Sequence, residues 1–163
     1  MILFVNFAGA ALGTILLASY GRRTLMIASS TLCVLGMFGM WLSTTLLVES
    51  TWLLYLLTIA FIVGFEIGLG PIVWLYLSEI CNDKATSVNT VVSWALNLLV
   101  SLTTPLLAEV LDNGSLWFLY GCTCMGGLIY ICVFMKETKG LSEGQIKALY
   151  ASNPLLQKQL AGD

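Results

Sequence analysis

One carboxylate, Glu66, stands in the middle of a long apolar run and is the first candidate for chemistry in this chain. An ionised carboxylate inside a bilayer costs roughly 2.5 to 3.5 kcal/mol on insertion scales, so we expect it to face a polar interior. Gly68, Gly70 and Pro71 follow it, and proline both lacks an N–H and clashes with the carbonyl four residues earlier. The pattern predicts a kinked or broken helix that lines a binding site. The alternative is a protonated carboxyl that only forms a hydrogen bond between helices.

A set of amide and hydroxyl side chains further along the chain is the second candidate. It recurs at steps of four, four, four and three residues, as Asn89, Ser93, Asn97, Ser101 and Thr104. At about 100° per residue these side chains share one face of a helix. They predict either hydrogen bonds between packed helices or the wall of an aqueous path for a hydroxylated solute. Trp74 and Trp94 lie near the two candidates, and aromatic faces beside amides suit a sugar.

The remaining reactive residue types do not point to catalysis or to a metal. The chain has five cysteines and no histidine. The cysteines lack the spacing of zinc ligands, and we interpret them as small hydrophobic residues. No pair of acid and base residues converges either, so we expect neither an enzyme nor a cofactor.

The composition predicts the elements that position these side chains. Of 163 residues, 58% are hydrophobic and 10% are charged, which excludes a water-soluble domain, a disordered chain and a nucleic-acid-binding protein. A helix that crosses the ~30 Å hydrocarbon core needs about 20 apolar residues. We therefore predict an all-α integral membrane protein in which residues 1–135 form a transmembrane bundle. Its five helices are expected at about 1–20, 25–48, 52–77, 86–108 and 115–135.

The five predicted spans differ in their polar pattern. The first carries Asn6 with Gly9 and Gly13, a face of small residues that lets a neighbouring helix approach closely. The third and fourth carry the two candidates described above. The second and fifth have little polar pattern beyond serine and threonine, and we expect them to form a lipid-facing scaffold.

The basic residues predict the orientation, because Lys and Arg are retained on the cytoplasmic side of short loops. If the helices alternate, all seven fall on one side: Arg22, Arg23, Lys84, Lys136, Lys139, Lys147 and Lys158. The other side receives the acidic residues Glu49, Glu109 and Asp112. We therefore expect the N-terminus outside and residues 136–163 as a cytosolic tail, with the plasma membrane favoured over an organelle. Ser142 and Gln145 have the spacing of a capping box, which predicts a short helix at about 143–150.

Three of these motifs, taken in order, resemble the sugar porter branch of the major facilitator superfamily, which includes the facilitative glucose transporters. Gly21-Arg22-Arg23 is similar to the end of the loop between that family's eighth and ninth helices. The run from Glu66 to Trp74 resembles its tenth-helix signature, and Glu137-Thr138-Lys139-Gly140 resembles its Pro-Glu-Thr-Lys-Gly motif after the twelfth helix. The resemblance covers nearly the whole chain and implies the C-terminal half, helices eight to twelve.

The resemblance implies a role for each matching residue. Positions that face the sugar in the family are matched by Asn6, Glu66, Trp74 and Asn97, with Trp94 close by. The cytoplasmic charge network that closes the inner gate is matched by Arg22, Arg23, Glu79 and Glu137. The chain departs from the family at several positions. Ala18-Ser19 replaces an acidic and basic pair, Lys136 replaces a proline, and Val73 replaces the second proline of the tenth-helix signature. Ser93 stands where Asn is common and Lys84 where Arg is usual.

The function implied is transport of a hexose-like sugar by alternating access, in which no bond is broken. The partners implied are a small-molecule sugar, the lipid bilayer and the N-terminal helices that these residues do not match, in the same or another chain. Both facilitated and proton-coupled transport agree with the resemblance. The alternative is a truncated membrane scaffold or assembly partner whose polar face serves only helix packing.

Overall fold

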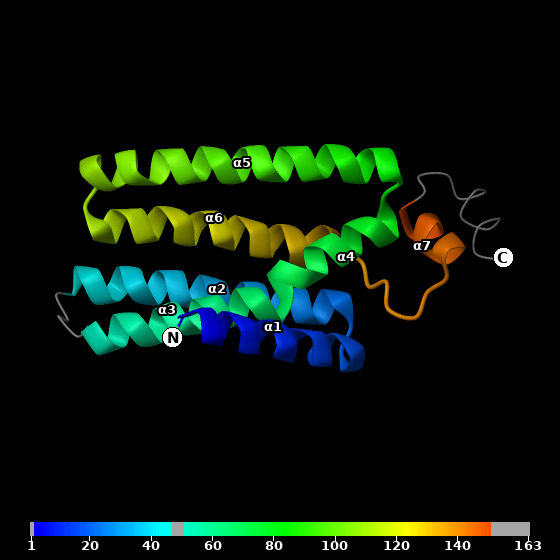
Figure 1. The fold of residues 1–163 in the computed structure, drawn as a ribbon, viewed down its shortest axis with the longest axis horizontal. Helices are drawn as coiled ribbons and strands as arrows, with labels where there is room; N and C mark the ends of the chain where they lie inside the picture. Colours follow the sequence, from blue (N-terminus) through cyan, green and yellow to red (C-terminus); the bar gives the residue numbers. More distant parts are fainter. Residues whose placement is uncertain (1, 47–50, 151–163) are drawn as a thin grey trace.

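The computed structural model describes residues 2–46 and 51–150, and over that part the chain is built from helices (Figure 1). In chain order they are α1 Ile2–Ser19, α2 Arg22–Thr45, α3 Thr51–Gly64, the π-helical turn η1 Phe65–Leu69, α4 Gly70–Ile80, α5 Asp83–Val110, α6 Asn113–Phe134 and α7 Glu143–Tyr150. Glu49 and Lys158, used to predict the orientation, lie outside the described residues.

Four helical segments of the described chain are long and apolar enough to cross a bilayer. They are α2, the continuous run Thr51–Ile80 through α3, η1 and α4, then α5, and α6 from Gly114 onward. The shorter α1 has 18 residues, and at 1.5 Å per residue it extends about 27 Å, close to the thickness of a hydrocarbon core. The predicted fold class, an all-α integral membrane protein, is confirmed.

Polar caps make two of the helices longer than their apolar runs. The Asn82 side chain accepts a hydrogen bond from the Ala85 N–H at 2.9 Å, so Asp83 and Lys84 form the first turn of α5 instead of the connection. Asp112 caps α6 in the same way, with 3.1 Å to the Ser115 N–H. An apolar pattern marks the part of a helix inside the membrane, whereas the caps decide where the helix begins.

Helix α2 lies at the centre of the molecule, with α6 along one side and α3 and η1 along another (Figure 1). Its buried side chains include Leu25, Met26, Cys33, Val34 and Met40. The prediction that the second span faces lipid is therefore wrong. Hydropathy cannot separate contact with protein from contact with lipid, because lipid tails are as apolar as leucine.

Helix α1 packs on the π-helical turn through its glycines. A Cβ added at Gly13 would lie 2.8 Å from the backbone oxygen of Glu66 and 2.9 Å from that of Ile67. A Cβ at Gly9 would lie 3.0 Å from the Cβ of Glu66. The predicted close approach through a face of small residues is confirmed, and its partner is η1.

Helix α5 is packed much less closely, and no residue in it is buried. It runs beside α6 at the outer edge of the molecule in Figure 1. Its side chains make two polar contacts to residues beyond α5 within the described chain. The Asn89 amide lies 4.0 Å from the Cys81 sulfur, and the Thr104 and Tyr120 hydroxyls lie 2.5 Å apart. Most of α5 therefore presents its side chains to the surroundings of the chain.

Candidate functional site

The membrane span that carries Glu66 changes its hydrogen-bond pattern at that residue. The Gly70 N–H donates to the Phe65 carbonyl, five residues earlier, which is the spacing of a π-helix. Pro71 stands in the first turn of α4, directly after the π-helical turn, and it has no N–H to donate to a carbonyl of that turn. Gly68 lies inside the turn and Gly70 directly after it. The axis of α4 is inclined to that of α3 in Figure 1, so the span is bent at the level of Glu66.

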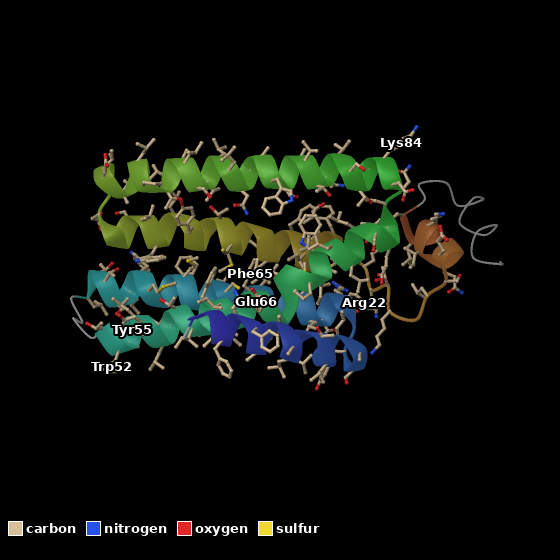
Figure 2. The ribbon with its side chains drawn as sticks, viewed as in Figure 1. Arg22, Trp52, Tyr55, Phe65, Glu66 and Lys84 are labelled. Carbon is tan, nitrogen blue, oxygen red and sulfur yellow. The ribbon has the colours of Figure 1, made fainter. Side chains whose placement is uncertain are left out.

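Glu66 is half-buried, and its carboxylate has no hydrogen-bond or ion-pair partner within the described residues. Its Cβ lies against Gly9 of α1, and Figure 2 shows Glu66 beside that helix. Asn6 precedes Gly9 by about one helical turn and therefore shares the face of α1 that contacts Glu66. The structure thus places two of the predicted sugar-facing residues on the packed elements α1 and η1, and the described helices supply no hydrogen bond to Glu66.

The other predicted sugar-facing residues lie on α4 and α5. Trp74 is 41% exposed on α4, and Trp94 is 65% exposed on α5. Asn97 is also exposed on α5, and α5 has no contact with α1. The five candidates consequently form two groups, one on α1, η1 and α4 and the other on α5. The described helices alone do not close around a ligand.

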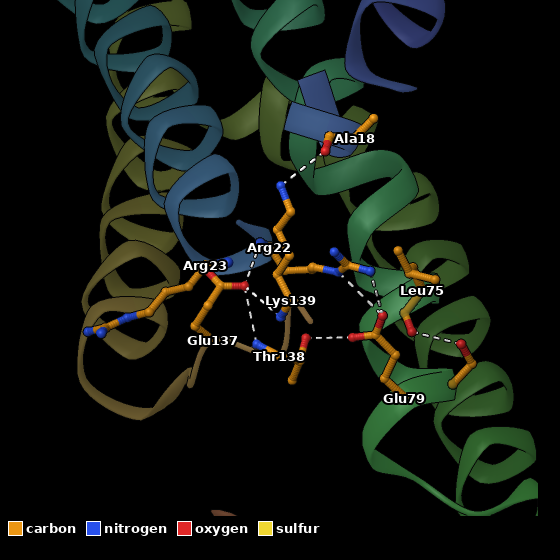
Figure 3. Close-up of polar contacts among 9 residues, drawn as sticks. Ala18, Arg22, Arg23, Leu75, Glu79, Glu137, Thr138 and Lys139 are labelled. Atoms are coloured by element: carbon orange, nitrogen blue, oxygen red, sulfur yellow. Dashed lines mark hydrogen bonds and ion pairs between the residues drawn. The ribbon is translucent and has the colours of Figure 1, made fainter. Parts of the chain in front are cut away.

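The predicted gate residues meet where α2 begins (Figure 3), in what we call the charged cluster: Arg22, Arg23, Glu79, Glu137, Thr138 and Lys139. The Glu137 carboxylate accepts from the backbone N–H groups of Arg22 at 2.8 Å and Arg23 at 3.1 Å. These are N–H groups that a helix leaves unpaired in its first turn, and the helix dipole favours an anion there. A Cβ at Gly21 would collide with Glu137 Oε2. The Gly-Arg-Arg motif therefore forms a carboxylate site at the start of α2.

The Arg22 side chain connects this site to α4. Its Nη2 lies 3.1 Å from Oε1 of Glu79, and its Nε donates to the same oxygen at 3.3 Å. The other oxygen of Glu79 accepts from the Thr138 hydroxyl at 2.5 Å. Arg23 differs, because its Nη2 donates at 2.8 Å to the Cys132 carbonyl of α6. The cluster thus joins α2, α4 and the segment after α6.

The pKa of Glu137 follows from its surroundings. Partial burial acts to raise it, but the backbone N–H groups of Lys139, Arg22, Arg23 and Thr138 donate to the charged form and outweigh the burial. The pKa therefore lies below its ordinary value of 4.5. Glu137 is ionised at neutral pH, as a residue that caps a helix by its charge must be.

Lys139 joins α1 to the cluster through contacts that the motif does not reveal. Its Nζ donates to the carbonyls of Ala18 at 3.0 Å and Ser19 at 2.8 Å, which belong to the last turn of α1. The departure at Ala18-Ser19 removes charged side chains, yet the backbone carbonyls there bind a lysine. Motif reasoning missed this contact because every residue type carries such a carbonyl.

Lys136, another of the departures, holds α7 against the bundle. Its Nζ donates to the Leu149 carbonyl at 2.6 Å and lies 5.1 Å from the centroid of the Tyr150 ring. The Tyr150 hydroxyl contacts that of Tyr76 on α4. At the other end of α7, Ser142 and Gln145 form reciprocal bonds: the Ser142 N–H donates to Oε1 of Gln145 at 3.0 Å, and the Gln145 N–H donates to the Ser142 hydroxyl at 3.4 Å. A cavity of about 560 Å³ lies between α7, the end of α4 and the charged cluster.

Comparison with known proteins gives a consistent result. Residues 1–150 match the family described as "Sugar (and other) transporter". The facilitated trehalose transporter Tret1 of Anopheles gambiae is 34% identical over 149 residues, a match that covers 85% of this chain and 19% of that protein. The protein of the same name from Bombyx mori is 33% identical over 154 residues, covering 88% and 30%. The chain therefore spans less than a third of the length of these relatives.

Solved structures show the same architecture. The inward open conformation of the xylose transporter XylE from E. coli superimposes with a TM-score of 0.84 at 25% identity, covering 92% of this chain and 35% of that chain. The proton:xylose symporter XylE bound to 6-bromo-6-deoxy-D-glucose gives a TM-score of 0.83 at 24% identity, covering 92% and 34%. At that identity the likeness shows the fold, which is shared with part of a major facilitator superfamily protein.

Proposed function

Because the chain belongs to the Sugar (and other) transporter family, we propose that it is part of a transporter that moves a sugar across a membrane by alternating access. Its relatives are named as transporters, for trehalose and for xylose, and not as enzymes. Since the chain covers 19% and 30% of two of those relatives, we propose that it acts with further helices, in the same or another chain. The observation that carries the proposal is the half-buried Glu66 on a π-helical turn, without a partner in the described residues.

We propose that the sugar binds between the two groups of candidate residues. Asn6, Glu66 and Trp74 would face it from one side, and Trp94 and Asn97 from α5. Carboxylate and amide groups suit sugar hydroxyls, which both donate and accept, and the tryptophan faces suit the apolar C–H side of the ring. Polar groups inside a bilayer need such partners or a water-filled cavity, because lipid tails supply no hydrogen bond.

The charged cluster is proposed as the gate at one end of this path. Its charge-assisted bonds join the ends of helices that alternating access moves relative to one another. Such bonds stabilise the state in which they form and are broken in the other state. Sugar binding then shifts the equilibrium between the two states only to the extent that the sugar binds one state more tightly than the other.

The proposed orientation places the charged cluster in the cytosol and the N-terminus outside, in the plasma membrane. Figure 2 shows Arg22 and Lys84 at one end of the molecule and Trp52 and Tyr55 at the other. Trp52 is 80% exposed and Tyr55 is 55% exposed. Basic residues on the cytosolic side and exposed amphipathic rings at the opposite interface support this arrangement.

A chimera tests the proposal. Residues 1–150 replace the matching segment of the Bombyx mori relative, and uptake of radiolabelled trehalose, glucose and xylose is measured in cells that lack their own carriers. We expect saturable uptake of at least one sugar. Trp74→Ala and Asn97→Ala should each weaken it about tenfold, equivalent to about 1.4 kcal/mol of lost contact. Trp52→Ala is the matched control, because this exposed tryptophan lies at the far end of the molecule from Arg22, and it should leave uptake unchanged.

The other outcomes are equally informative. Uptake that survives both Trp74→Ala and Asn97→Ala would contradict the site assignment. A folded chimera that reaches the membrane and transports none of the sugars would favour the scaffold alternative. Dependence of uptake on external pH and on a protonophore separates proton-coupled from facilitated transport.

A further inference from the structure

Ser29 is a serine of α2, 2% exposed, that lies directly against the π-helical turn carrying Glu66. Its hydroxyl donates to the Gly64 carbonyl at 2.6 Å and accepts from the Leu69 N–H at 3.0 Å. Residues 64 and 69 are five apart, the pair that a π-helical hydrogen bond joins. A side chain from another helix is thus hydrogen-bonded to the backbone at both ends of the turn.

Glycines allow this contact. A Cβ at Gly68 would lie 2.5 Å from the Cβ of Ser29, 2.8 Å from its Oγ and 2.9 Å from the Leu25 carbonyl. Gly68 is therefore needed for α2 to approach the turn closely enough for Ser29 to reach the backbone. Because Gly13 of α1 packs on the carbonyls of Glu66 and Ile67, the turn is held by two helices.

The energetic consequence follows from burial, because Ser29, Gly64 and Gly68 are all buried. A buried backbone group left without a partner costs more than one exposed to water, so the Ser29 hydroxyl stabilises the turn. A side chain inserted beside the helix ladder is also a recognised cause of a helix bend. Without the hydroxyl, the Gly64 carbonyl and the Leu69 N–H lose this partner, and the π-helical turn is held less firmly. A shift of its hydrogen bonds by one residue would turn one half of the span by about 100° relative to the other.

We propose that Ser29 is a positioning residue for Glu66: its hydroxyl maintains the π-helical turn and thereby directs the Glu66 carboxylate. The part of this inference that concerns the role of Glu66 rests on the proposed function. The hydrogen bonds of Ser29 rest on the structure alone. Ser29 does not touch the path itself, because it lies between α2 and the turn.

The chain contains a matched control for this proposal. Ser30 is the next residue of α2, is 3% exposed, and its hydroxyl has no hydrogen-bond partner within the described residues. Ser29→Ala and Ser30→Ala therefore remove the same atom from the same helix at the same depth, and only the first removes hydrogen bonds. Ser29→Cys keeps a weaker donor and acceptor and serves as a partial rescue.

Two measurements on the full chain in nanodiscs test the proposal. The first is the rate at which dicyclohexylcarbodiimide modifies Glu66, followed by mass spectrometry across a pH series. The second is hydrogen exchange of the Leu69 amide. Loss of one buried hydrogen bond predicts exchange about tenfold faster in Ser29→Ala. The rate of carbodiimide modification of Glu66 should change in Ser29→Ala, with Ser29→Cys intermediate and Ser30→Ala like the parent chain.

Specific results would overturn the proposal. Equal effects of Ser29→Ala and Ser30→Ala would show that the hydrogen bonds of Ser29 do not matter. Faster Leu69 exchange with unchanged Glu66 modification would show that the turn is held but Glu66 is not positioned. If Ser29→Ala is too unstable to purify, the comparison of Ser29→Cys with Ser30→Ala decides in the same way. If Ser29→Ala changes the rate of Glu66 modification but leaves sugar uptake by the chimera unchanged, the result would support the role of Ser29 and contradict the transport role of Glu66.

Discussion

The start of α2 and the polar face of α5 differ in whether their polar groups have partners within the described residues. Around the start of α2, the Glu137 carboxylate accepts four backbone N–H groups and the Arg22 guanidinium pairs with Glu79. Along α5, Ser93 and Asn97 are exposed and have no hydrogen bond to another helix within the described residues. Both helices are long apolar spans, so their difference does not come from hydropathy.

This difference shows what holds helices together in a membrane. An apolar side chain gains little free energy when it exchanges contact with lipid for contact with another helix. Close packing of helices therefore relies on small residues and on polar groups that form hydrogen bonds or ion pairs. Helix α2 has both, because it lies against Gly64 and Gly68 and begins at the charged cluster. Helix α5 has polar groups without partners in the described chain, which suits a surface reserved for a ligand or for further helices.

The largest expected effect is on a glycine contact of α2. Gly68→Ala places a Cβ 2.5 Å from that of Ser29, and such overpacking should cost about 3 kcal/mol of unfolding free energy. Gly127→Ala on α6 is the control, because a Cβ there meets nothing within 4 Å. Reversible unfolding in mixed micelles measures both variants. Similar stabilities would contradict the close packing of α2 on the π-helical turn.

Loss of the carboxylate that caps α2 comes next. Glu137→Ala leaves its N–H donors without their acceptor and should cost about 2 kcal/mol, the usual range for hydrogen bonds to a charged group with allowance for its partial exposure. Glu109→Ala removes an exposed carboxylate near the end of α5 and should cost far less. The same unfolding assay compares the two. A larger loss for Glu109→Ala would reverse the contrast between the two regions.

Acid should weaken the charged cluster in a smaller and graded way. Because the folded-state pKa of Glu137 is lowered from 4.5, its contribution to stability is complete above that value and is lost as the pH falls through the folded pKa. The midpoint temperature of the parent chain should therefore decrease in that range more than that of Glu137→Gln. Parallel pH profiles for the two proteins would show that Glu137 contributes nothing by its charge.

The smallest effect is expected on α5. Asn97→Ala and Ser101→Ala should each change the stability of the chain by less than about 0.5 kcal/mol, because neither side chain bonds to another helix in the described residues. Thr104→Ala is the internal comparison, since its hydroxyl contacts that of Tyr120. Losses above about 1 kcal/mol for Asn97→Ala would favour the alternative in which the polar face of α5 serves helix packing.

Parts of the candidate site could be predicted because their residue types are unusual in a membrane. A carboxylate, a proline and a row of amides inside apolar runs are costly there, and they drew attention to Glu66, Pro71 and Asn97. Ser29 gave no such signal, because serine is common in apolar helices and its use depends on which backbone it meets. The lysine contacts of Lys136 and Lys139 were missed for the same reason, since their acceptors are backbone carbonyls.

The sequence by itself determined the apolar spans, the place of the helix interruption and the position of the charged residues other than Glu66 at or beyond the ends of the spans. Each follows from the cost of putting a given residue type or a missing N–H into hydrocarbon, which is a local property. The tertiary structure alone decided that α2 is central, that Glu137 caps it and that Ser29 reaches the π-helical turn. The Arg22 and Glu137 contact joins residues 115 positions apart. Such contacts depend on helix packing and on backbone groups common to every residue, so no local pattern predicts them.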